Sequence, residues 1–135
     1  MPTLARIRVA TYNVHKCRGI DRRIRPDRIA RVIRQLDADA IAIQEILNVD
    51  SDEPELGQAR YLAENLAGYS WCCGENRILR FGPYGNMTLS RHPIRFWHNY
   101  DVTWKRRERR GCLRTDISAG RPDARVQRPF RDWFP

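Results

Sequence analysis

Two polar side chains end otherwise apolar segments in the first third of this 135-residue chain, and both types suit metal-assisted chemistry. Asn13 ends the segment RIRVATYN, and Glu45 ends AIAIQE. A carboxylate and a carboxamide supply hard oxygen ligands, which Mg²⁺ prefers, while the ion keeps waters that substrate phosphates can replace. His15, two residues beyond Asn13, is the best placed of the three histidines to contact phosphate. These residue types outline a metal site for phosphate chemistry.

The same residues also have a structural explanation. Asn13 is a typical turn residue, because its side chain accepts hydrogen bonds from the following backbone, and Glu45 is acceptable as a solvated strand end. A histidine beside a strand is more often a structural group than a catalyst, which applies to His15, His92 and His98 alike. Spacing alone leaves both explanations open.

The predicted elements determine whether Asn13 and Glu45 meet. Residues 6–14 alternate as an extended strand, and the short, β-branched segment 40–46 is typical of a buried strand. Between them, Pro26 is of the residue type typical of a first helical position, and an apolar stripe at helical spacing follows it. Four residues form that stripe: Ile29, Val32, Ile33 and Leu36. Such a strand–helix–strand unit normally pairs its strands in parallel, so that both polar residues lie at the carboxyl edge of one sheet.

The rest of the chain predicts a loop, a second helix and consecutive strands. Residues 48–57 are acidic and contain proline and glycine, as surface loops do, and residues 58–67 have one apolar helical face. Strand-like alternation follows in four segments: 69–74, 85–91, 94–104 and 112–117. We therefore expect an α/β (α+β) fold, a mixed sheet with helices packed outside.

The last 18 residues have a different character. Residues 118–135 contain three prolines and no periodic pattern. We therefore expect a domain over residues 1–117 and an irregular, mobile tail over residues 118–135.

Composition excludes several classes of protein. With 41% hydrophobic and 30% charged residues, the chain is not typical of a disordered segment. It has no apolar run near the roughly 18–20 residues of a membrane span, and its first residues lack the features of a signal peptide. The four cysteines have no CxxC spacing, so we expect reduced thiols in a cytoplasmic protein.

The chain is strongly basic, with a net charge of +9. A basic surface favours phosphate-rich partners such as nucleic acid or an anionic membrane, because binding releases condensed counterions. Arginine supplies 23 of the 25 basic residues, which a genome rich in G and C also explains. The run KRRERR at 105–110 either binds phosphates or is a solvated connection between strands.

Three segments carry a more specific pattern: VATYNVH at 9–15, PDRIARVIRQLDADAIAIQEI at 26–46 and YGNMTLSRHPI at 84–94. Together they resemble the opening of the endonuclease/exonuclease/phosphatase superfamily, metal-dependent phosphoesterases with a deoxyribonuclease-like αββα sandwich. The resemblance covers about residues 6–117. It implies the N-terminal half of a four-layer αββα sandwich and Mg²⁺ or Mn²⁺ held at or near Asn13 and Glu45. It also makes the strand segment with Asn86, Ser90 and Arg91 mainly architectural.

The chain departs from this family beyond about residue 117. Members continue through a His-Leu strand, a Gly-Asp-x-Asn motif and a final Ser-Asp-His, and none of these occurs here. The resemblance therefore implies a truncated domain in which one sheet face lacks its full cover, including residues of the Ile41–Ile43 and Tyr69–Cys73 strands. Self-association through that face is a further expectation.

The function expected from the resemblance is metal-dependent hydrolysis of a phosphoester, of phosphodiesterase or phosphatase type. The substrate class stays open among nucleic acid, a phospholipid and a small phosphoester. Without the distal motifs, we expect the chain to be weakly active or inactive by itself, with Asn13, Glu45 and His15 as its candidate catalytic residues. The alternative is a non-catalytic remnant or a basic fragment that binds phosphate or nucleic acid.

Overall fold

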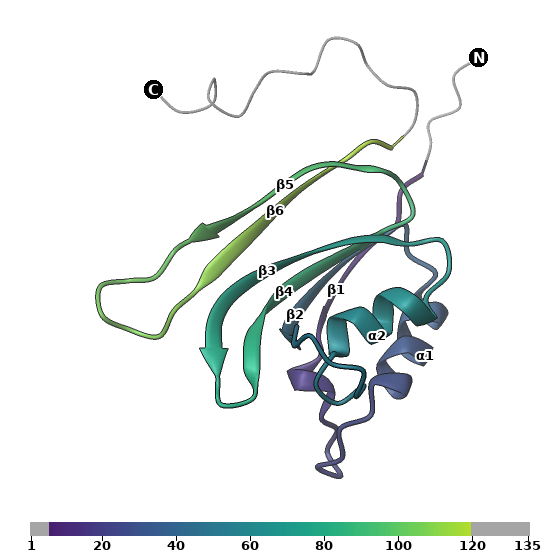
Figure 1. Cartoon of the computed structure of the whole chain (residues 1–135). Helices are drawn as coiled ribbons and strands as arrows, with labels where there is room; N and C mark the ends of the chain where they lie inside the picture. The colour runs from purple at the N-terminus through teal and green to yellow at the C-terminus, as the bar shows by residue number, and fades with distance from the viewer. Residues whose placement is uncertain (1–5, 120–135) are drawn as a thin grey trace, which may run out of the picture.

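The first half of the chain forms a parallel strand pair connected by a helix. The computed structural model describes residues 6–119 (Figure 1). Strand β1 (Val9–Asn13) pairs in parallel with β2 (Ala40–Leu47), so that Asn13 lies opposite Gln44. Helix α1 (Pro26–Leu36) has its proline in the first turn, where no backbone N–H is needed. The predicted strand–helix–strand unit is confirmed.

A long hairpin completes the main sheet. Strands β3 (Ser70–Leu79) and β4 (Gly82–Ser90) are antiparallel, and β4 pairs with β2, which gives the order β1-β2-β4-β3. Helix α2 (Gln58–Asn65) precedes the hairpin and follows the predicted loop. The hairpin extends β3 five residues beyond the predicted end at Gly74, because its partner strand continues to pair with it through Leu79.

A second, two-stranded sheet packs on the hairpin. Strands β5 (Ile94–Asp101) and β6 (Gly111–Ile117) are antiparallel and lie against β3 and β4 on the side away from the helices (Figure 1). The hydroxyls of Thr88 on β4 and Thr115 on β6 lie 2.8 Å apart and join the two sheets by a hydrogen bond. Helices, a mixed sheet and a second sheet thus form successive layers, which confirms the predicted fold class.

The hydrophobic core lies between the four-stranded sheet and the two helices. Its largest members are almost completely buried: Ile33 of α1, Ile41, Ile43 and Ile46 of β2, Leu62 of α2, and Met87 and Leu89 of β4. They come from both helices and from the two central strands. This core fixes the helices on one face of the sheet.

The opposite face of the sheet is covered unevenly. At β3, Cys72 lies against Thr115 of the second sheet and is buried. At β1 and β2, no described residue covers this face: Val9 is 70% exposed, and Thr11 and Ala42 are exposed too. The expectation that this sheet face lacks full cover is therefore met at Ala42, which is exposed, but not at Cys72, which the second sheet buries. Ile41 and Ile43, which alternate with Ala42, point to the helices instead.

Three further sequence predictions concern the cysteines, membrane-spanning segments and the tail. All four cysteines lie within the described residues and are free thiols. Among residues 6–119, no helix has the length and apolar character needed to cross a membrane. The predicted tail falls, from residue 120 onward, outside the described residues and stays a prediction.

Candidate functional site

A β-bulge in β2 sets the position of Glu45. Ile43 pairs with Met87 and Ile46 with Gly85, so the two residues between them face one residue of β4. Both isoleucines are fully buried, although residues three apart on a regular strand point to opposite faces. The extra residue of the bulge resolves this conflict. It places Glu45 in the left-handed region, with φ of 58°, which is a strained conformation for a glutamate.

A left-handed turn follows β1 and positions His15. His15, Lys16 and Cys17 have φ values of 50°, 54° and 59°. Cys17 is buried in the core, and the Nε2 amide of Gln58 donates a 2.7 Å hydrogen bond to the carbonyl of Lys16. Gln58 is itself fully buried and also accepts a hydrogen bond from the Leu47 backbone, so one side chain connects the turn, β2 and α2.

The turn and the bulge bring the three predicted site residues together. Nδ1 of His15 lies 2.8 Å from Oε2 of Glu45. The side-chain oxygen of Asn13 accepts a 3.1 Å hydrogen bond from the backbone N–H of His15. Asn13 therefore makes the turn hydrogen bond that its structural explanation expects. This turn lies directly beside Glu45, where the metal site is predicted.

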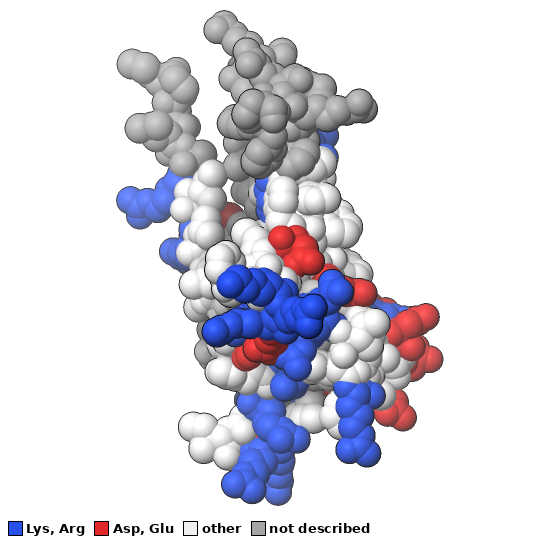
Figure 2. All heavy atoms as spheres, turned by 90° about the vertical axis from the view of Figure 1, so that its left-hand side faces the viewer, with Lys and Arg blue, Asp and Glu red and all other residues white. Residues whose placement is uncertain are grey.

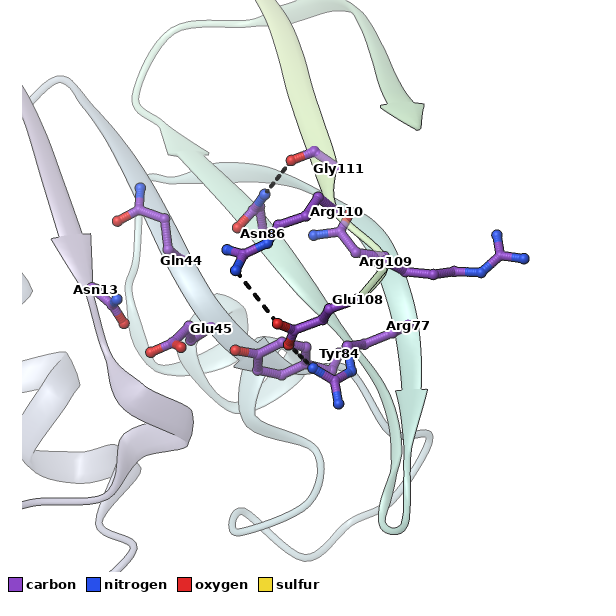
Figure 3. Close-up of a pocket in the computed structure, with 11 residues that line it drawn as sticks. Asn13, Gln44, Glu45, Arg77, Tyr84, Asn86, Glu108, Arg109, Arg110 and Gly111 are labelled. Atoms are coloured by element: carbon purple, nitrogen blue, oxygen red, sulfur yellow. Dashed lines mark hydrogen bonds and ion pairs between the residues drawn. The ribbon is translucent and has the colours of Figure 1, made fainter. Parts of the chain in front are cut away.

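Glu45 faces a cavity of about 360 Å³ at the carboxyl end of β1 and β2 (Figure 3). Residues from five strands and from the loop before β6 line it: Asn13, Gln44, Glu45, Asn76, Arg77, Tyr84, Asn86, Glu108, Arg109, Arg110 and Gly111. The run KRRERR thus supplies part of the lining. In Figure 3, Arg110 reaches across toward Glu108, whereas Arg109 extends away from the cavity.

Charges in the cavity are arranged in pairs. Glu108 forms ion pairs with Arg77 and, at 3.4 Å, with Arg110. Burial, together with the neighbouring Glu45 carboxylate, raises the pKa of Tyr84 to about 12, so its phenol keeps its proton at neutral pH. The lining holds three arginines and two carboxylates, and a divalent cation beside Glu45 would make the cavity more positive and more attractive to phosphate.

The donor atoms around Glu45 fit a hard cation. Oε2 of Glu45 is buried and has no aligned hydrogen-bond donor, although Nδ1 of His15 is close. A carboxylate has about four acceptor positions, so the Glu45 carboxylate can accept a metal ion in addition to its contact with His15. Asn13 supplies a neighbouring amide oxygen. Among residues 6–119, no cluster of three or more His, Cys, Asp or Glu side chains is suited to a metal. The candidate metal ligands among the described residues are thus one carboxylate and one amide.

Other residues considered in the sequence lie elsewhere. His92 follows β4 and lies 3.8 Å from Asp39, and His98 packs edge-on against Tyr100 within β5. Ser90 is buried and exchanges hydrogen bonds with the His92 backbone.

Two more of the residues named in the sequence lie on β4 and directly after it. Arg91, just after it, binds Asp37 at 2.7 Å, which is a structural contact. Asn86 lines the cavity and donates to the carbonyl of Gly111 at 3.4 Å. Arg77, Tyr84 and Glu108 were not among the predicted site residues. For Glu108, the one indication in the sequence was its position as a glutamate inside the basic run KRRERR.

The model of the Endonuclease/Exonuclease/phosphatase family matches residues 10–133 of this chain. A protein of Escherichia coli K12 described as uncharacterized protein YbhP is 28% identical over 114 residues, which are 78% of this chain and 45% of that protein. A Shigella flexneri protein of the same name matches equally well. The chain thus spans about half the length of these relatives.

Solved structures show the same fold. An endonuclease/exonuclease/phosphatase from Beutenbergia cavernae DSM 12333 superposes with a TM-score of 0.73 at 26% identity, over 84% of this chain and 34% of that one. An endonuclease/exonuclease/phosphatase family protein from Leptotrichia buccalis C-1013-b gives a TM-score of 0.65 at 22% identity, over 83% of this chain and 50% of that one.

Proposed function

This chain belongs to the endonuclease/exonuclease/phosphatase family, and from that premise we propose that its cavity is the metal-binding part of a phosphoester hydrolase. One observation supports the proposal most strongly: the Glu45 carboxylate, whose buried Oε2 lies 2.8 Å from Nδ1 of His15, lines a cavity together with Asn13. The family generally depends on a divalent metal.

Glu45 and Asn13 are the residues that would hold Mg²⁺ or Mn²⁺. When bound, the ion supplies Lewis-acid catalysis by withdrawing charge from a phosphoryl oxygen. Most of its coordination positions would stay with water, because two protein oxygens are few for either ion. Binding by this chain is therefore expected to be weak.

The chain's own side chains have separate tasks around the phosphate. Arg77 and Arg110 present guanidinium groups to the cavity, and guanidinium binds phosphate oxygens in bidentate geometry. Tyr84 keeps its proton and can donate it in a hydrogen bond. His15 contacts Glu45 through Nδ1 and orients that carboxylate.

We also propose that the chain alone turns over slowly or not at all. No histidine–aspartate pair lines the cavity among the described residues, and the chain spans about half of its curated relatives. General acid–base catalysis and positioning of water typically contribute several powers of ten to a rate. The substrate class stays open among nucleic acid, a phospholipid and a small phosphoester.

The alternative proposal is a non-catalytic fragment that binds phosphate or nucleic acid. The arginines at the cavity support it, because Arg77 and Arg110 need no metal to bind a phosphate. The two proposals differ in whether Glu45 matters to ligand binding and whether a longer chain gains activity.

A metal titration tests the first step. Mn²⁺ binding is measured by calorimetry and water relaxation for the wild type, Glu45→Gln and the control Glu55→Gln, which alters an exposed loop glutamate. Removing a group that only hydrogen-bonds to a metal ligand commonly costs about 10-fold in metal affinity, so the loss of the Glu45 carboxylate itself should cost at least that much. Equal Mn²⁺ affinity in the wild type and Glu45→Gln would move the metal site elsewhere.

An activity assay tests the second step. The 135-residue chain should give negligible Mg²⁺-dependent hydrolysis of bis-p-nitrophenyl phosphate, plasmid DNA or phospholipid. A chain extended to the length of its relatives should gain activity, and Glu45→Ala should abolish that gain. Turnover by the short chain that disappears in Glu45→Ala would show that it is an enzyme by itself, and His15 would be the first base to test.

A further inference from the structure

A second cavity, of about 530 Å³, lies next to the first and has a different character. It lies between the loop of residues 18–24 and the β3–β4 turn. His15 lines this second cavity and contacts Glu45, which lines the first. Its walls are mainly apolar: Ile24, Leu47, Leu79 and Phe81. Its basic residues are Lys16, Arg18 and Arg80. We call it the loop-tip groove.

Two apolar side chains project from the loop tips beside this groove. Ile20 is 105% exposed at the tip of a turn. A 2.9 Å hydrogen bond from the backbone N–H of Arg22 to the carbonyl of Gly19 closes this turn. Phe81 is 61% exposed, in the two-residue turn that joins β3 to β4. A single exposed apolar residue is ordinary on a protein surface. Two of them at the tips of adjacent loops, on either side of an apolar groove, indicate an interaction surface.

Three arginines at this surface are available for a partner. Within residues 6–119, Arg18, Arg22 and Arg80 form no ion pair. The one acidic residue of the same loop, Asp21, is held by Arg28 through two hydrogen bonds of 2.9 and 3.0 Å. The 18–24 loop and the β3–β4 turn lie at the lower end of the molecule in Figure 1, opposite the points where the described chain begins and ends. Figure 2 shows Lys and Arg side chains projecting from that lower end.

We propose that the loop-tip groove docks the chain on an anionic lipid surface, with Ile20 and Phe81 entering the headgroup region and the arginines contacting lipid phosphates. Peripheral membrane binding combines these two terms, apolar insertion and attraction of basic residues to anionic lipid. Nucleic acid fits the surface less well, because it offers no apolar medium for Ile20, and the isoleucine side chain has no aromatic face on which a base could stack. The proposal does not depend on catalysis at Glu45.

Vesicle sedimentation tests the proposal with the full chain. The wild type should bind vesicles of phosphatidylcholine mixed with phosphatidylglycerol and should not bind pure phosphatidylcholine. Ile20→Ser combined with Phe81→Ser should weaken binding about 10-fold or more. Arg18→Ala combined with Arg80→Ala should weaken vesicle binding too, by about fivefold for each arginine removed. All four positions are at or near loop tips, and circular dichroism verifies that each variant is folded.

The control removes a comparable apolar side chain from another loop. Trp104 is 67% exposed in the β5–β6 connection, and Trp104→Ser should leave vesicle binding unchanged. Absence of vesicle binding, equal binding by the serine double variant, or loss in Trp104→Ser alone would overturn the proposal. Binding to a DNA duplex without binding to vesicles would assign the surface to nucleic acid and overturn it as well.

Discussion

The two faces of the four-stranded sheet are covered by different means. On one face, α1 and α2 bury Ile41, Ile43 and Leu89 completely. On the other face, β5 and β6 cover the β3–β4 hairpin, whereas Val9 and Ala42 on the first two strands stay exposed. The described residues thus close the helix side over β2 and β4, where Trp71 of β3 stays 42% exposed, and leave the opposite side open at β1 and β2.

The candidate site lies where these two regions meet. The bulge and the left-handed turn are held from the helix side, through Ile46, Cys17 and Gln58. Gln44, whose amide contacts the Thr11 hydroxyl at 3.0 Å, lies on the uncovered side. The comparison indicates that the helix side maintains the geometry of the site, while the uncovered side is where a further chain segment or a second copy would add to it. Four predictions test this division.

The largest expected effect is on the helix side. Ile43→Ala removes a fully buried side chain between the sheet and the helices, and such substitutions typically cost about 2–5 kcal/mol of unfolding free energy. Urea unfolding followed by circular dichroism measures the loss. The matched control is Val9→Ala, with an expected loss below about 0.5 kcal/mol. Similar losses at both positions would mean that the two faces are equally packed.

The second prediction uses two thiols on the helix side. Burial raises the pKa of Cys17 and of Cys73 from 9.0 to about 12. Between these values the unfolded state releases a proton that the folded state retains, so stability is fully present below about pH 9 and falls as the pH rises toward 12. The slope is on the order of 1.4 kcal/mol per pH unit for each thiol.

Urea unfolding in reductant at several alkaline pH values measures that slope. Cys17→Ala should flatten it even though the variant is less stable throughout. Cys112→Ala, at an exposed position, serves as the control and should leave the slope unchanged. A slope that Cys17→Ala does not change would show that this thiol is not protected from ionisation by the helix-side core.

The third prediction concerns the contact between the two sheets. Thr88→Val removes the hydroxyl that bonds to Thr115 and should cost about 1 kcal/mol, the usual net value of one hydrogen bond. Thr11→Val makes the same change on the uncovered face, where it disturbs only an exposed contact with Gln44 and should cost less. Equal losses in the two variants would contradict the difference in cover between β4 and β1.

The smallest effect on stability is expected on the uncovered face itself. We propose that this face allows self-association, because β1 is an edge strand with exposed apolar residues. Val9→Lys should change the unfolding free energy by less than about 0.5 kcal/mol. It should also remove any dimer that light scattering detects in the wild type. A wild-type chain that remains monomeric at every accessible concentration would refute self-association.

The sequence predicted the elements whose periodicity is carried by their own residues. The alternation before Asn13, the stripe from Ile29 to Leu36 and the β-branched run before Glu45 correspond to β1, α1 and β2. The neighbouring positions of Asn13 and Glu45 followed from the parallel order of two strands. These features were predictable because they depend on local spacing and on one topological rule.

The remaining features depend on partners distant in the sequence. The bulge at Glu45 arises because Ile43 and Ile46 must both reach the helix-side core, which local alternation does not reveal. The extension of β3 depends on pairing with β4. Glu108 and Arg110 enter the cavity because the β5–β6 connection lies over the end of the main sheet. A charged run in sequence gives no indication of where its loop will lie.

The left-handed turn at His15–Cys17 has a consequence for amide hydrogen exchange. Each non-glycine residue in this conformation costs roughly 1–2 kcal/mol relative to the right-handed form, so transient opening of the turn is easier than opening of β2. Such an opening breaks the 2.9 Å hydrogen bond that the backbone N–H of Cys17 donates to the carbonyl of Val14. A ligand that bridges Asn13 and Glu45 would hold the turn closed and slow exchange at these amides, which makes exchange there a measure of site occupancy that requires no turnover.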